Sequence, residues 1–160
     1  MKAPTRAEVG SWIAAAKGNT LFRWGVVAAA AIAIIDQISK FWIVNVVKLP
    51  DRIQPCDLHP EDICRQISVS PVFDLTYVEN RGASFGMLAG GLGSRIILSM
   101  ISIAVATALF IWLGRLDRRF AAAGAALIIG GAIGNLYDRI AYGYVVDFLD
   151  FSGLYFPWVF

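Results

Sequence analysis

The sequence is poor in charge and in the residues that most hydrolases use for catalysis. Only 16% of its 160 residues are charged, and it has one histidine, His59, and two cysteines. A Ser-His-Asp or Cys-His arrangement would depend on that single histidine. Two cysteines and one histidine at this spacing match no common zinc pattern, and a net charge of +2 gives no indication of nucleic-acid binding.

Long apolar runs dominate the chain. Hydrophobic residues make up 58% of the sequence, well above the roughly 45–50% of soluble proteins. A helix needs about 20 apolar residues to cross a bilayer, and three runs come close to or exceed that length. We therefore predict one α-helical integral membrane domain over residues 1–160, with spans at 24–47, 95–114 and 121–141.

The basic residues predict the direction of each crossing. Residues 1–23 and the link 115–119 are rich in lysine and arginine, as cytoplasmic segments are. Loop 48–94 is expected on the periplasmic side, because its first part, 48–81, has six acids against four bases. We expect a short interfacial helix at 6–17, and an interfacial segment on the outer side at 142–160, where aromatic residues are frequent.

The outer loop carries signals of β structure. Residues 67–78 are rich in β-branched and aromatic residues with rough alternation, which predicts a strand followed by a turn at Asn80-Arg81-Gly82. Cys56 and Cys64 are either a disulfide, which an oxidising compartment permits, or two free thiols. Gly143 is expected to end the third span and to leave Asp147 on irregular backbone.

Polar residues inside the spans indicate a site. A charge near the bilayer centre costs roughly 2.5–3.5 kcal/mol, yet Asp36 and Lys40 lie in the first span and Asp138 at the end of the third. Asp36 and Lys40 are four residues apart, so mutual neutralisation would explain the lysine. Asn135, Asp138 and Arg139 share a helix face, and Asp147 follows on the same side of the membrane.

Small residues recur every four positions in the third span, at Ala122, Ala126, Gly130 and Gly134. Such a seam allows a neighbouring helix to approach closely. The glycines of GGAIGN do not indicate a phosphate loop, because the preceding strand and the Lys-Ser/Thr ending are absent. We interpret them as packing residues.

The remaining chemistry is that of carboxylates. Two close acids can share a proton, so that one acts as base toward water while the other polarises a carbonyl. For a lone acid such as Asp147, simple hydration at the interface is the alternative. Two other classes of function remain open: a small proton- or ion-coupled transport subunit, and a non-catalytic lipid-binding scaffold.

Four ordered blocks resemble the bacterial lipoprotein signal peptidases, also called signal peptidase II. They are Asp36-Gln37-Ile38-Ser39-Lys40, the stretch Asn80-Arg81-Gly82-Ala83-Ser84-Phe85-Gly86, the stretch from Gly130 to Arg139, and Val145-Val146-Asp147-Phe148. The resemblance implies a four-helix inner-membrane protease, with three of the spans present here and a small periplasmic β-rich cradle. It would cut diacylglyceryl-modified prolipoproteins just before the lipidated cysteine.

The resemblance also implies roles for individual residues. Asp147 would be one of two catalytic aspartates, and Asp138 a supporting acid paired with Arg139. The other pocket residues would be Asp36, Lys40, Asn80, Gly82, Gly131, Asn135 and Arg139. Inhibitors of the globomycin type are expected to bind, together with membrane lipid, and no metal, cofactor or nucleic acid is expected.

Two features depart from the family pattern. Ser84 stands where the family usually has an alanine. In the family, an Asn-x-Ala-Asp block with the second catalytic acid follows a phenylalanine such as Phe160, and this sequence ends at that residue. We therefore expect the 160-residue form to be inactive.

Overall fold

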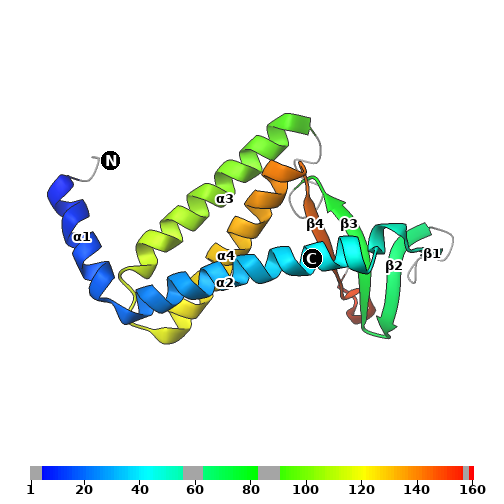
Figure 1. The fold of residues 1–160 in the computed structure, drawn as a ribbon, viewed down its shortest axis with the longest axis horizontal. Coiled ribbons are helices and arrows are strands. Elements are labelled where there is room, and N and C mark those ends of the chain that lie inside the picture. The colour runs from blue at the N-terminus through cyan, green and yellow to red at the C-terminus, as the bar shows by residue number, and fades with distance from the viewer. Residues whose placement is uncertain (1–4, 56–62, 83–90, 157–158) are drawn as a thin grey trace. The chain divides into compact units, whose positions relative to one another are not determined.

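The computed structural model describes residues 5–55, 63–82, 91–156 and 159–160, which form four α-helices and a small sheet (Figure 1). The helices are α1 (Arg6–Gly18), α2 (Thr20–Phe41), α3 (Gly91–Leu113) and α4 (Arg119–Ala141). The strands are β1 (Ile53–Pro55), β2 (Ile63–Ser70), β3 (Phe73–Asn80) and β4 (Val145–Asp150). Short turns of other helix types lie at Trp42–Val46, Leu49–Asp51 and Ser152–Leu154.

Within the described ranges, three helical segments are long and apolar enough to cross a membrane: Thr20–Asp51, Gly91–Leu113 and Arg119–Ala141. Only 17%, 11% and 33% of the residues in their most apolar windows, in the same order, are buried inside the protein. Apolar side chains left uncovered on that scale are those of a lipid-facing surface. This confirms the predicted α-helical membrane fold with three spans.

The chain forms two compact units, and their boundary falls inside each of the three long helices. The first unit comprises Met1–Asp36 with Met100–Leu136, and the second comprises Gln37–Ser99 with Tyr137–Phe160. The described parts of the two units differ in content. The first is helical, and the second contains the whole sheet.

The core of the first unit is built from small and aliphatic residues. Ala29 of α2, Leu113 of α3 and Ala126 of α4 are buried there. A Cβ built on Gly130 would lie 2.7 Å from the carbonyl oxygen of Ala29 and 2.7 Å from the Cβ of Ile32. The predicted small-residue seam is therefore the surface on which α4 receives α2.

A helix is present where one was predicted at 6–17, as α1, and its interfacial position stays a prediction. Its N-terminus has a complete capping box, in which the Glu8 amide donates to the Thr5 hydroxyl and the Thr5 amide donates to the Glu8 carboxylate. Asn19 links α1 to α2, and its side-chain amide donates to the carbonyl of Leu116 over 2.9 Å. The same side chain accepts from the amides of Leu21 and Phe22 at the start of α2.

The second unit contains a four-stranded antiparallel sheet in the order β1-β2-β3-β4. The single strand predicted over 67–78 is wrong, because β2 and β3 form a hairpin that turns at Pro71 and Val72. Proline has no amide hydrogen for a sheet ladder and favours turns. The rough alternation in the sequence belongs to two strands rather than one.

Gly143 ends α4 as predicted. It adopts φ of +88°, and the amides of Tyr142 and Gly143 both donate to the carbonyl of Asp138, as in glycine-terminated helices. The irregular backbone predicted for Asp147 is wrong, because the chain enters β4 only two residues after this glycine. Asp147 is thereby fixed opposite Val78 of β3.

Cys64 is disulfide-bonded. Cys56, the only other cysteine of the chain, lies outside the described residues, as do His59 and Ser84. The structure therefore removes the free-thiol alternative for Cys64.

Candidate active site

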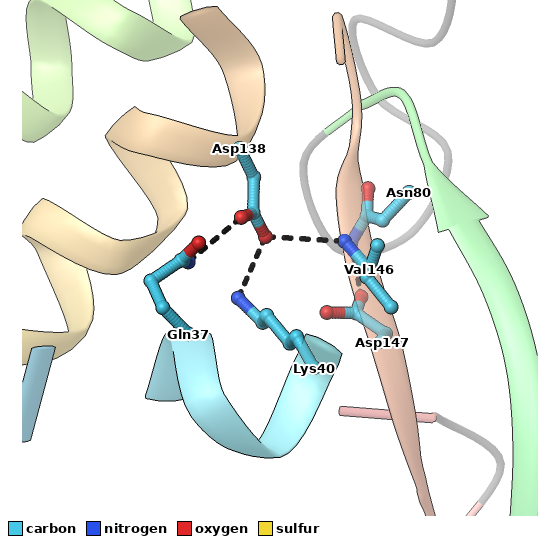
Figure 2. A network of polar contacts seen from close by, with 6 residues as sticks. All are labelled: Gln37, Lys40, Asn80, Asp138, Val146 and Asp147. Carbon is cyan, nitrogen blue, oxygen red and sulfur yellow. Dashed lines mark hydrogen bonds and ion pairs between the residues drawn. The ribbon is translucent and has the colours of Figure 1, made fainter. Parts of the chain in front are cut away.

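Asp147 of β4 and Asn80 of β3 are diagonal neighbours in the β3–β4 ladder, because Asp147 pairs with Val78 and Asn80 pairs with Val145 (Figure 2). The side-chain amide of Asn80 donates to Oδ2 of Asp147 over 2.8 Å. The carbonyl oxygen of the same Asn80 side chain accepts from the amide of Gly82 over 3.1 Å. This second bond forms the predicted turn at Asn80-Arg81-Gly82 and aims the amide nitrogen of Asn80 at the carboxylate.

Asp138, near the end of α4, is completely buried and holds three elements together. Its Oδ2 accepts from Nζ of Lys40 over 2.7 Å and from the backbone amide of Val146 over 3.3 Å. Its Oδ1 accepts from the side-chain amide of Gln37 over 2.8 Å. Figure 2 shows these three bonds converging on one carboxylate, and we call this group the Asp138 clamp.

The clamp corrects the partner expected for Asp138. The resemblance suggested Arg139, but consecutive residues on a helix do not face each other. The carboxylate binds Lys40 of α2 instead, 98 residues away in the sequence. Lys40 is itself only 7% exposed, so this is a buried ion pair with further hydrogen bonds to its acid.

The surroundings of Asp147 have opposing effects on the pKa of its carboxyl group. Burial raises the pKa of its carboxyl group above the ordinary value, while the Asn80 hydrogen bond and the positive charges of Lys40 and Arg139 lower it. The negative charge of Asp138 adds to the rise, and the net direction is upward. Asp147 therefore holds a proton more readily than an exposed aspartate does.

Three of the other predicted site residues, Asp36, Gly131 and Asn135, belong to the first unit, and Arg139 is half-buried in the second. Asp36 lies against α4, where a Cβ on Gly134 would come 2.8 Å from the Asp36 Cγ, so only glycine leaves room for this carboxyl group. Asn135 is half-buried on α4. Gly131 has open space beside it, unlike the packing glycines Gly130 and Gly134.

Three contributors were missed by reasoning from the sequence. Gln37 lies three residues before Lys40 on one helix face, which was a usable signal. The amide of Val146 carries no signal, because every residue except proline has one. Arg95 of α3 donates to the carbonyl of Ile140 over 2.7 Å and so satisfies a carbonyl at the end of α4.

The arrangement provides one fixed, half-buried carboxylate suited to proton transfer. Asp147 is oriented by Asn80 and follows the clamped amide of Val146. A carboxyl group in a fixed position can act as a general acid or a general base toward a bound substrate. The described residues contain no group of three or more histidine, cysteine, aspartate or glutamate side chains that could hold a metal ion.

Comparisons with known proteins agree on one family. The family described as signal peptidase (SPase) II matches residues 28–160. A lipoprotein signal peptidase of Caulobacter vibrioides is 44% identical over 140 residues, which are 86% of this chain and 76% of the relative. One from Nitrobacter hamburgensis is 41% identical over 134 residues, which are 82% of this chain and 74% of the relative.

Two solved structures resemble the fold, and both are described as bacterial membrane enzymes. One has a TM-score of 0.63 and 25% identity, with 85% of this chain and 79% of the other covered. The second has a TM-score of 0.61 and 26% identity, with 79% and 69% covered.

Proposed function

This chain belongs to the signal peptidase II family, which processes lipoprotein signal peptides, and we propose that it does so as an intramembrane aspartic endopeptidase with Asp147 as one catalytic acid. The observation that carries the proposal is the Asn80–Asp147 pair. The Asp147 carboxyl group is half-buried on a strand and has a raised pKa. The side-chain amide of Asn80 donates to its Oδ2 over 2.8 Å and holds it in place.

The proposed reaction uses two carboxyl groups that share one proton. The ionised member removes a proton from water as the water attacks the scissile carbonyl carbon, and the protonated member donates to the carbonyl oxygen. Burial raises the pKa of the Asp147 carboxyl group, which favours its sharing of the proton with the second acid. Asp138 is not a suitable second acid, because Lys40, Gln37 and the Val146 amide already occupy both oxygens of its carboxylate.

The second acid is proposed to lie in an Asn-x-Ala-Asp block after Phe160, as the resemblance implies. A polypeptide that lacks this second acid is then expected to have no peptidase activity, because Asp138 is already held by Lys40 and the Val146 amide. Peptide cleavage by that polypeptide would contradict this part of the proposal and leave the role of Asp147 intact.

The family makes the protein a multi-pass inner-membrane protein whose substrates are prolipoproteins. We propose that its N-terminus is cytoplasmic, in line with the basic residues at 1–23 and 115–119. Asp147 and the sheet then act at the periplasmic side. Asp36, Gly131, Asn135 and Arg139 are proposed to contribute to the pocket for substrate and for globomycin-type inhibitors.

The test is Asp147→Asn in a form of the protein that includes the second acid. Asparagine keeps the size of the side chain and a carbonyl acceptor for Asn80, but it cannot exchange a proton. We expect turnover of a diacylglyceryl-modified prolipoprotein to fall about 10²–10⁴-fold with substrate affinity nearly unchanged. Asp51→Asn, which alters an exposed acid, is the matched control, and normal turnover by Asp147→Asn would remove this residue from the chemistry.

A further inference from the structure

The first unit contains an open cavity of about 760 Å³ that the proposed reaction does not use. Its lining comes from α1 and from the C-terminal end of α3: Glu8, Val9, Ser11, Trp12, Ala15, Ile111, Gly114 and Arg115. The match to the peptidase family begins only at residue 28. The α1 wall of the cavity therefore lies outside the part of the chain that defines the family.

The cavity lies at the C-terminal end of the apolar span of α3. The apolar span of α3 ends at Leu113, and the lining residues Ile111, Gly114 and Arg115 lie on both sides of that end. A membrane span ends where hydrocarbon gives way to the polar headgroup region. Trp12 fits this level, because tryptophan concentrates at membrane interfaces.

Trp12 is fixed as one wall of the cavity. Its indole N–H donates to the carbonyl of Ile111 over 3.1 Å, and its ring packs against Phe22 and Phe110 at centroid distances of 6.0 and 6.2 Å. A Cβ on Gly114 would lie 2.8 Å from the indole. Glycine at this position therefore allows α1 to pack directly on the end of α3.

The cavity presents one positive and one negative charge. Among the described residues, no acidic side chain forms an ion pair with the exposed Arg115 guanidinium. Glu8 is held by two bonds from Thr5, both to its Oε2, and these bonds lower the pKa of the Glu8 carboxyl group. A ligand that fits this pair carries an anion and a hydrogen-bonding cation close together.

We propose that this cavity binds a phospholipid with a phosphoethanolamine headgroup, with the phosphate on Arg115, the ammonium on Glu8 and the glycerol region against Trp12. Arginine is suited to phosphate because its planar fork donates two parallel hydrogen bonds. A primary ammonium supplies the donors that a carboxylate accepts. The site would attach α1 to the membrane lipid, independently of the peptidase reaction.

The test measures lipid binding to the detergent-solubilised protein by native mass spectrometry. Phosphatidylethanolamine and phosphatidylglycerol with identical acyl chains are the probes. Arg115→Gln removes the phosphate contact, and Arg118→Gln is its matched control, because Arg118 does not line the cavity. Glu8→Gln removes the negative charge but keeps the capping box, which accepts glutamine in this position. Asp117→Asn controls for the loss of an acid.

The wild-type protein is expected to bind phosphatidylethanolamine about fivefold more tightly than phosphatidylglycerol. Arg115→Gln should weaken both lipids about fivefold or more, and Glu8→Gln should abolish the preference without weakening phosphatidylglycerol. Both controls should resemble the wild type. Equal binding of the two lipids by the wild type, or equal effects of Arg115→Gln and Arg118→Gln, would overturn the proposal. Displacement of the lipid by soluble phosphoethanolamine would also overturn it, because the occupant would then be a free solute.

Discussion

At Gly130 in the first unit, α2 and α4 meet by close packing of the backbone, whereas in the second unit buried charges join the elements. The α4 backbone at Gly130 packs against Ala29 and Ile32. Asp138 joins α4 to Lys40 of α2 and to the amide of Val146 beside Asp147. Packing without directional bonds supplies stability in lipid, while hydrogen bonds also fix an orientation.

The difference indicates a division of tasks. A helix seam tolerates small sliding movements as long as it stays closely packed, but a proton-transfer group needs a defined position. The Asp138 clamp is placed where the chain passes from α4 to β4, immediately before Asp147. No buried side-chain nitrogen or oxygen atom in the described ranges is without a hydrogen-bond partner. The buried polar groups of the second unit therefore all form hydrogen bonds.

The sharpest way to break this comparison is to remove the carboxylate of the Asp138 clamp. Asp138→Ala leaves Lys40 buried without its acid and the Val146 amide without its acceptor. The loss of one partner from a buried ion pair costs about 3–5 kcal/mol, so we expect a fall of that size in the free energy of unfolding. Unfolding in mixed detergent and SDS micelles measures it.

A double variant tests whether the loss at Asp138 comes from the unpaired charge of Lys40 or from the missing side-chain volume. Asp138→Leu combined with Lys40→Met removes both charges, and it should recover most of the loss, since replacing a whole buried pair by apolar residues is often neutral. Asp51→Ala, at an exposed acid, should change the unfolding free energy little. An Asp138→Ala effect no larger than that of Asp51→Ala would mean that the clamp does not hold the second unit together.

The helix seam offers a smaller effect and a matched control one residue away. Gly130→Ala would place a methyl group 2.7 Å from a backbone oxygen and should destabilise the protein by about 1–3 kcal/mol through overpacking. Gly131→Ala meets nothing within 4 Å and should be neutral or slightly stabilising, because alanine favours helix more than glycine does. Equal effects of the two changes would mean that α2 and α4 are not in close contact at Gly130.

The features that could be predicted from the sequence depend on neighbours along the chain. The seam appears as a repeat of four, and the end of α4 appears as Gly143. The partners of Asp138 could not be predicted, because Lys40 lies in another helix and Val146 contributes only its backbone. The β2–β3 hairpin was not predicted, because the alternation of two adjacent strands resembles that of one long strand. Pro71, which cannot continue a sheet ladder, marks the turn between them.

The smallest expected effect concerns the pH dependence of stability at Asp147. Its pKa is raised in the folded protein, chiefly by burial, so the folded state binds a proton more tightly than the unfolded chain does. The aspartate therefore disfavours folding at neutral pH, and this penalty disappears as the pH falls through the folded pKa toward the ordinary value of 3.8. Asp147→Asn should raise the unfolding free energy at pH 7, and the gain should vanish near pH 3. Parallel unfolding curves at the two pH values measure the difference, with Asp51→Asn as control. A variant that is less stable than wild type at pH 7 would show that the Asn80 bond and the charges of Lys40 and Arg139 outweigh burial at Asp147.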